Sequence, residues 1–293
     1  MSETNDPAAA VARLIALLDV EALEVDLFRG PCYDGGWHRV YGGQVVAQAL
    51  VAASKTVRPE RLPHSLHAYF LRPGDPQAPI ICRVERDRDG QSFSTRRVVA
   101  IQHGRQIFNM AASFQVAEDG LTHGTAMPRV AGPDGLPNEF DLHQLAAESV
   151  PEPYRTLWST RDRPIEVRPV TYNDVARPRK TKPIAHNWFR AASMVPEDSV
   201  LARCLLAYAS DLTLADTCLL PHAVNWTDPA LQGASIDHAV WFHASPDLND
   251  WLLIAQESPR ACGGRGLNRG SIFSRTGELV ASVMQEGLIR YRG

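Results

Sequence analysis

The sequence predicts an α+β fold built from two tandem modules, each with a long helix wrapped by a curved antiparallel β-sheet. Three observations support this fold class. Each half of the chain contains a long helical pattern, each such pattern is followed by strand patterns joined through turn residues, and the second half repeats the order of the first. The chain has 293 residues, which is enough for two domains of typical size.

The first half opens with a short helical pattern over residues 11–20 and an alternating, strand-like pattern over 23–28. A longer helix is predicted over 44–57, where Val45, Ala49 and Ala53 share one face and the many alanines allow close approach to a flat sheet. Turn-forming sequences then separate four predicted strands, over 66–71, 79–85, 93–102 and 106–116. The first half is therefore a strand meander wrapped around one helix.

Residues 118–160 differ in composition from the rest of the chain. Prolines, glycines and acidic residues cluster there, and only residues 140–147 show a helical pattern. We therefore expect an N-terminal module over residues 1–117, a linker over 118–160 and a C-terminal module over 161–293.

The second half repeats the pattern of the first. A helix is predicted over 199–212, with Leu201, Leu205 and Tyr208 on one face. Strands are predicted before and after it, over 165–169, 187–190, 235–243, 251–257, 266–274 and 278–291. This order indicates a double hot-dog architecture. Joining the two sheets edge to edge would cover strand edges that each module otherwise exposes.

Composition and charge exclude several classes of protein. The formal net charge is −3 and the pI is about 6.4, which argues against a nucleic-acid-binding protein that relies on a basic face. No run of ~18 apolar residues occurs, so we expect no membrane-spanning helix.

The cysteines indicate a reducing compartment. The chain has five, an odd number without a C-x-x-C pair, and its first residues are acidic where a secretion signal is basic. We expect a cytoplasmic protein that uses its cysteines as small buried apolar residues and needs no metal or cofactor. These cysteines are Cys32, Cys82, Cys204, Cys218 and Cys262.

Six segments of the chain closely resemble the acyl-CoA thioesterase II family. Three lie in each half, and together with their surroundings they cover nearly the whole chain outside the linker. They are Tyr41–Gln44, His64–Gly74, Asp89–Val98, Ala207–Leu212, Ile236–His243 and Val280–Gly287. The resemblance implies a double hot-dog fold and hydrolysis of fatty acyl-CoA to a free fatty acid and CoA. The expected partner is an acyl-CoA substrate, and we expect a homo-oligomer, either a dimer or a tetramer.

The resemblance also implies three catalytic residues, all in the C-terminal module. They are an aspartate at the end of the second helix, a hydroxyl residue at the start of the next strand and a glutamine on the last strand, here Asp211, Ser235 and Gln285. Ser235 departs from the threonine that is more usual in the family; it keeps the hydroxyl but loses the methyl group that restricts χ1.

These residue types suit thioester hydrolysis by direct attack of water. A thiol leaves readily as thiolate, so the protein must mainly position a water molecule and stabilise the oxyanion. A carboxylate can accept a proton from that water, while a hydroxyl and an amide hold it. Apolar neighbours and the C-terminus of the helix should both raise the pKa of Asp211 and make it a better base.

Two other functions remain open from the sequence. A hot-dog enoyl-CoA hydratase would use an Asp/His pair on a helix and the following loop, and Asp216 and His222 are available for it. A non-catalytic acyl-CoA-binding protein would be expected to lack Asp211 or Gln285, and both are present. No G-x-S-x-G sequence occurs, which argues against an α/β-hydrolase.

The repeat predicts that only one module is catalytic. When the two halves are aligned, Lys55 corresponds to Asp211 and Ser65 to Ser235, while Ser113 falls near the position of Gln285. A charged ammonium group cannot accept a proton from water, so the first module lacks a base.

Overall fold

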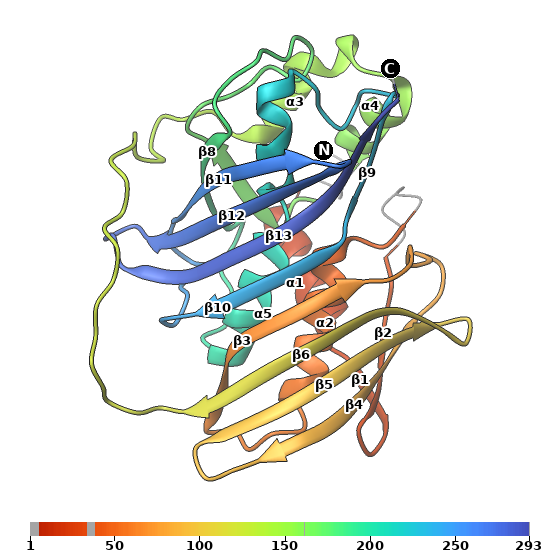
Figure 1. The fold of residues 1–293 in the computed structure, drawn as a ribbon, viewed down its shortest axis with the longest axis vertical. Helices are drawn as coiled ribbons and strands as arrows, with labels where there is room; N and C mark the ends of the chain where they lie inside the picture. The colour runs from red at the N-terminus through yellow and green to blue at the C-terminus, as the bar shows by residue number, and fades with distance from the viewer. Residues whose placement is uncertain (1–5, 34–38, 161, 293) are drawn as a thin grey trace.

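The computed structural model describes residues 6–33, 39–160 and 162–292, and within them thirteen strands form one continuous sheet. The strand order is β1-β2-β4-β5-β6-β3-β10-β13-β12-β11-β8-β7, and β9 pairs with β13 off this path. Figure 1 shows the sheet curving around the helices, with the N-terminal half below and the C-terminal half above. The α+β class predicted from the sequence is confirmed.

The described residues of the first half form two helices and six strands. Its elements are α1 (Pro7–Leu18), β1 (Glu21–Glu24), β2 (Leu27–Gly30), α2 (Gly42–Ser54), β3 (Arg61–Phe70), β4 (Ile80–Asp89), β5 (Phe93–Gln102) and β6 (Arg105–Val116). The helix predicted over 44–57 and the four strands after it are all present. Each element begins or ends within a few residues of its predicted boundary. Such differences are expected because element ends fray and a sequence pattern does not define the terminal residue.

The second half has the same plan after an intervening helical segment. That segment contains α3 (Glu139–Ala146), a 3₁₀ turn (Ala147–Ser149) and α4 (Glu152–Thr160). The remaining elements are β7 (Ile165–Pro169), β8 (Ile184–Ala191), α5 (Ser199–Ser210), the 3₁₀ helix η3 (Leu214–His222), β9 (Leu231–Ser235), β10 (Asp237–Phe242), β11 (Leu252–Cys262), β12 (Arg265–Ser274) and β13 (Leu279–Tyr291).

The two half-sheets join through antiparallel pairing of β3 with β10. The register places Leu66 opposite Val240 and Ala68 opposite His238, and all four side chains are buried. This pairing covers two strand edges that would otherwise be exposed, as the sequence predicts. Because it fixes one half relative to the other, it also fixes where their helices meet.

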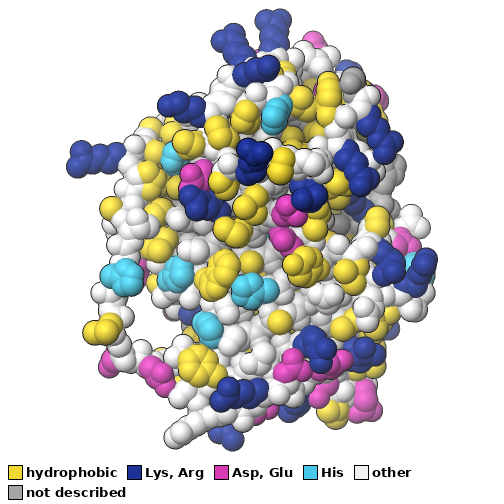
Figure 2. Space-filling view, viewed as in Figure 1, with side chains coloured by type: hydrophobic (Ala, Val, Ile, Leu, Met, Phe, Trp, Pro, Cys, Tyr) yellow, Lys and Arg dark blue, Asp and Glu magenta, His cyan; other side chains and the backbone are white. Residues whose placement is uncertain are grey.

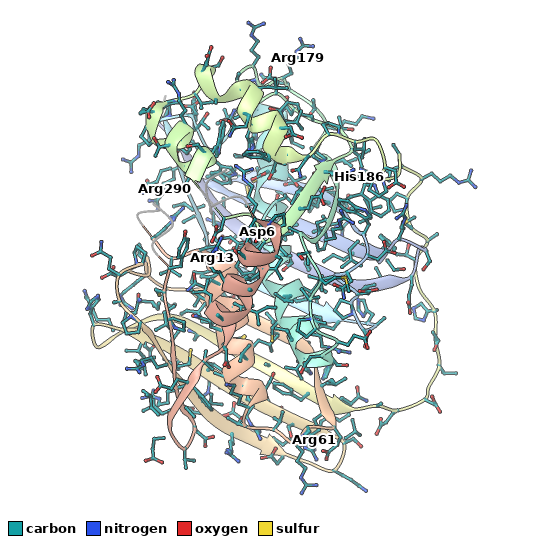
Figure 3. The ribbon with its side chains drawn as sticks, turned by 180° about the vertical axis from the view of Figure 1, so that it is seen from behind. Asp6, Arg13, Arg61, Arg179, His186 and Arg290 are labelled. Atoms are coloured by element: carbon teal, nitrogen blue, oxygen red, sulfur yellow. The ribbon has the colours of Figure 1, made fainter. Side chains whose placement is uncertain are left out.

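Helices α2 and α5 pack against each other inside the curve of the sheet. Both helices are largely apolar and buried, and one core cluster includes Val46 and Leu50 of α2 with Leu205 and Leu206 of α5. Seen from behind, α1 lies across the open side of this helix pair (Figure 3). The alanine-rich sequence of α2 lets it pack closely against α5 and the sheet, since its small side chains take up little space between them.

The outer face of the sheet is partly covered. Figure 2 shows charged, histidine and apolar side chains interspersed over the visible face, which fits an antiparallel sheet with one face toward water. The chain after β6 covers part of this face, because Trp188 donates from Nε1 to the Ala131 carbonyl at 2.8 Å and packs with Trp251 and Phe273. Among the described residues, no helix is long and apolar enough to span a membrane.

Three local expectations are corrected by the structure. The strand predicted over 23–28 is a hairpin of β1 and β2, turned at Asp26, whose φ is +59° and whose carboxylate pairs with Arg86. The strand predicted over 235–243 is divided into β9 and β10 at Ile236. In the segment 118–160, α4 is a second helix that its polar composition does not reveal.

Candidate active site

Asp211, Ser235 and Gln285 lie together at one point of the fold. The Gln285 side-chain amide donates from Nε2 to Asp211 Oδ1 at 2.5 Å and to Ser235 Oγ at 3.1 Å. One amide group therefore contacts both other residues, although more than seventy residues separate Asp211 from Gln285 in the chain. The structure thus brings together all three residues that the sequence singles out.

Local structure explains the position of each residue. Asp211 caps the C-terminal end of α5 with φ −88° and ψ −5°, so its side chain leaves the helix at its last turn. Ser235 ends β9, where the chain changes partners: Ser235 lies opposite Gly287 of β13, and Asp237 lies opposite Tyr69 of β3. Gln285 is fully buried on the inner face of β13.

Burial dominates the electrostatics of Asp211. Desolvation raises the pKa of its carboxyl from 3.8 to about 6. Hydrogen bonds from Gln285 and from the backbone N–H of Gly43, together with the charge of Arg39, act in the opposite direction. The pKa is raised as the sequence predicts, and burial is the main cause.

The first half of the chain supplies one wall of this site, although the three catalytic residues predicted from the sequence all lie in the second half. The N-terminus of α2 faces the C-terminal end of α5, and the Tyr41 hydroxyl donates to the Tyr208 carbonyl at 2.9 Å. Glycine is required at this junction, since a Cβ on Gly42 would lie 2.7 Å from Asp211 Oδ2 and one on Gly43 would lie 2.5 Å from the Tyr208 carbonyl oxygen. The two consecutive glycines in the Tyr41-Gly42-Gly43 sequence are the feature of the sequence that indicates such a close approach.

A large cleft opens beside Asp211 and Ser235. Its volume is about 1370 Å³, and both Asp211 and Ser235 line it. Phe140 of α3 and Trp158 of α4 lie on its wall, together with His186 of β8 (labelled in Figure 3). Apolar side chains and a few polar groups around a cavity of this size are typical of a site for a small organic ligand.

Asp216 and His222, the pair considered for a hydratase, do not form a hydrogen-bonded unit. Asp216 accepts a hydrogen bond from the indole Nε1 of Trp226, and burial raises the pKa of its carboxyl to about 7. His222 lies at the end of the same 3₁₀ helix. Within the part of the chain that the structure describes, no group of three His, Cys, Asp or Glu side chains could hold a metal ion.

The C-terminal end of α2 carries Lys55 at the position where α5 carries Asp211. Lys55 caps this helix and pairs with Asp19 at 2.7 Å, away from the cleft. Arg96, which is 1% exposed, instead donates to the Thr56 carbonyl at 3.0 Å and to Asp89 at 2.8 Å. A guanidinium group therefore occupies the region beside the C-terminal end of this helix.

The fold places the protein in the hot-dog class. A protein of unknown function with a hot-dog fold from Alicyclobacillus acidocaldarius superposes with a TM-score of 0.76 over 95% of this chain and 98% of that chain, at 19% sequence identity. An acyl-CoA thioesterase II, TesB2, from Mycobacterium marinum gives a TM-score of 0.78 at 44% identity, covering 95% of this chain and 98% of that one.

Sequence comparison defines the family more closely. A family model for acyl-CoA thioesterase matches residues 157–288, and one for the acyl-CoA thioesterase N-terminal domain matches 33–115. Acyl-CoA thioesterase 2 of Haemophilus influenzae is 44% identical over 95% of this chain and 97% of its own length. Human acyl-coenzyme A thioesterase 8 is 38% identical over 99% and 93%, respectively. The chain belongs to the acyl-CoA thioesterase family.

The raised pKa of Asp211 predicts a pH-dependent effect of Asp211→Asn on stability. The folded-state pKa, about 6, exceeds the unfolded value near 3.9, so ionisation of Asp211 costs folding free energy as pH rises through 6. The asparagine variant lacks this cost. The difference in free energy of unfolding between the variant and wild type should therefore be about 1–3 kcal/mol larger, in favour of the variant's stability, at pH 8 than at pH 4, as measured by urea denaturation.

Asp119→Asn, on the exposed segment after β6, is the control and should not reproduce this difference. An Asp211→Asn effect that is the same at pH 4 and pH 8 would contradict the raised pKa.

Proposed function

We propose that this protein hydrolyses fatty acyl-CoA to a free fatty acid and CoA by direct attack of a water molecule. The observation that carries the proposal is the hydrogen-bonded group of Asp211, Ser235 and Gln285 at the wall of a cleft of about 1370 Å³. Membership of the acyl-CoA thioesterase family supports the same reaction.

In the proposed mechanism Asp211 is the general base. It takes a proton from water as the water oxygen forms a bond to the thioester carbonyl carbon. Gln285 fixes the Asp211 carboxylate and the Ser235 hydroxyl through its two N–H groups, and the Ser235 O–H remains available to hold the water. A base with a pKa of about 6 is ionised at neutral pH and still accepts a proton readily.

The tetrahedral intermediate then breaks its C–S bond. The carbonyl oxygen carries the negative charge in this intermediate, and the positive end of α2 beside Asp211 favours such charge. Collapse restores the C=O bond and releases CoA as the thiolate, a good leaving group with a pKa near 8.5. The proton held by Asp211 passes to the thiolate or to solvent, which restores the base.

One productive site per chain is part of the proposal. The first half has Lys55 where the second half has its carboxylate, and Arg96 lies beside the end of α2. An enoyl-CoA hydratase is less well supported, since Asp216 is bonded to Trp226 and not to His222. The module boundaries, the cytoplasmic location and the homo-oligomeric state stay predictions from the sequence.

Asp211→Asn should remove the general base. We expect kcat for palmitoyl-CoA to fall by ~10²–10⁴, the usual contribution of general-base catalysis, measured by thiol release with a chromogenic thiol reagent. In the wild type, kcat/KM should rise with pH and level off above about 6, because only the ionised carboxylate accepts a proton. The Asp211→Asn variant should not show this rise of kcat/KM with pH. Near-normal turnover in a folded variant would remove Asp211 from the mechanism.

No acyl-enzyme should form on Ser235 or on a cysteine during turnover. The Ser235 hydroxyl accepts from Gln285, and no histidine among the described residues is hydrogen-bonded to it. Burial raises the pKa of the Cys204 thiol far above neutrality. Intact-mass spectrometry of acid-quenched reactions should show unmodified protein only. An acyl adduct on any of these residues would refute direct attack by water.

Lys55→Ala should leave turnover within about twofold of wild type, because its ion pair with Asp19 is on the surface and such pairs contribute little. Titration with a non-hydrolysable acyl-CoA analogue should count one site per chain. Two productive sites per chain, or loss of turnover in folded Lys55→Ala, would mean that the first module is catalytic.

A further inference from the structure

Gln285 has a buried neighbour on each adjacent strand. The pairing of β12 with β13 places Asn268 directly opposite Gln285. On the other side of β13, Ala239 of β10 lies opposite Met284, so the same register places His238 of β10 opposite Gln285. All three side chains are 0% exposed. They form a polar row across three strands of the inner face, directly behind the amide that contacts Asp211 and Ser235.

Each of these side chains has one buried polar atom without a hydrogen-bond partner among the described residues. The atoms are Gln285 Oε1, Asn268 Oδ1 and His238 Nδ1. Leaving such a group unpaired costs folding free energy, and buried polar groups in native proteins are nearly always paired. Three unpaired atoms on directly neighbouring residues therefore indicate a shared partner, since opposed side chains on paired strands have Cβ atoms about 5 Å apart.

The known contacts of the three residues limit what that partner can be. The Asn268 amide nitrogen faces the Gly266 carbonyl at 3.4 Å and the Cys218 side chain, which leaves Oδ1 on the opposite side of the planar amide. Gln285 Nε2 is engaged by Asp211 and Ser235. Two oxygen acceptors and one imidazole nitrogen remain, and a water molecule can donate to both oxygens while accepting from the nitrogen.

We propose that one buried water accepts from His238 Nδ1–H and donates to Gln285 Oε1 and Asn268 Oδ1, which makes His238 and Asn268 positioning residues for Gln285. Three hydrogen bonds are the usual number for a buried water. The arrangement requires neutral His238 protonated on Nδ1. Burial lowers the pKa of its imidazole to about 4, so the ring is neutral at the pH of catalysis.

The remaining imidazole nitrogen then accepts from Ser210. His238 Nε2 lies 2.8 Å from Ser210 Oγ, and the Ser210 hydroxyl also lies 2.9 Å from the Ala207 carbonyl. This hydroxyl has one proton and two acceptors within reach, and the proposal assigns the proton to His238. Since Ser210 immediately precedes Asp211, the same row of groups ties the end of α5 to the sheet.

The water has a specific consequence for Gln285. If the amide of Gln285 rotated by 180°, its oxygen would face the Asp211 carboxylate, and two acceptors would repel each other. A donor held behind Oε1 favours the orientation in which Nε2 faces Asp211 and Ser235. Asn268 and His238 therefore act on the reaction only through Gln285. This inference rests on the proposed function, because Gln285 matters for turnover only if it organises the hydrolytic site.

The main experiment replaces Asn268 with leucine, which has similar size and no hydrogen-bonding groups. We expect kcat for palmitoyl-CoA to fall by about tenfold with KM within twofold, since a displaced Gln285 misplaces the water and the base but not the substrate. Asn268→Ser, whose hydroxyl can still accept from a water, should recover most of the turnover. Ser258→Ala is the matched control: it removes a buried hydroxyl on β11 that bonds the Leu267 carbonyl and does not contact Gln285.

A double variant separates a role through Gln285 from a general loss of packing. In a Gln285→Ala background, Asn268→Leu should cause no further fall in kcat, because residues that act as one unit are non-additive. An equal fall in both backgrounds, or wild-type kcat in Asn268→Leu, would overturn the inference. Wild-type turnover in Gln285→Ala would instead contradict the proposed function, so the two failures are distinguishable.

The tautomer of His238 gives a readout independent of activity. Nitrogen-15 NMR of the full-length protein at pH 7 should show His238 neutral with its proton on Nδ1, and Asn268→Leu should perturb that signal more than Ser258→Ala does. A proton on Nε2 would leave Nδ1 unable to donate and would overturn the proposed arrangement.

Discussion

The chemistry of the site depends on one carboxylate, which lies where the N-terminal end of α2 packs beside the C-terminal end of α5. Asp211 caps the C-terminal end of α5, and the backbone N–H of Gly43 at the start of α2 donates to it. The negative end of one helix and the positive end of the other thus act on the same group. The β3–β10 pairing fixes one half of the sheet relative to the other and so positions these helix ends, and the absence of a side chain at Gly42 leaves room for the carboxylate.

Opposing effects set the proton affinity of this carboxylate. Burial raises the pKa of the Asp211 carboxyl, while hydrogen bonds from Gln285 and from the Gly43 N–H favour the ionised form. The result is a pKa of about 6, low enough for ionisation and high enough for proton transfer. Gln285 lowers the pKa of Asp211 only while its N–H groups face the carboxylate. The groups behind Gln285 Oε1 therefore affect the same pKa, because they favour that orientation of the amide.

The elements that follow a simple period could be predicted from the sequence. Helix α2 and the strands β5 and β7 match their predicted ranges closely, because hydrophobic periodicity and turn residues are local signals. The hairpin at Asp26 could not be read, since its turn depends on a left-handed backbone conformation and a distant ion pair with Arg86. Contacts such as Gly43 with Asp211 and Asn268 with Gln285 depend on how the halves and strands align, which no local pattern records.

The central claim is that water attacks the thioester directly, with Asp211 as base and not as nucleophile. A single turnover of palmitoyl-CoA by excess enzyme in H₂¹⁸O tests it most directly. Direct attack places one ¹⁸O atom in the released fatty acid in the first turnover, and the peptide that contains Asp211 stays unlabelled. If Asp211 attacked the thioester and water then opened the resulting mixed anhydride at the Asp211 carbonyl, an Asp211 oxygen would enter the acid and ¹⁸O would appear in that peptide, which would contradict direct attack by water.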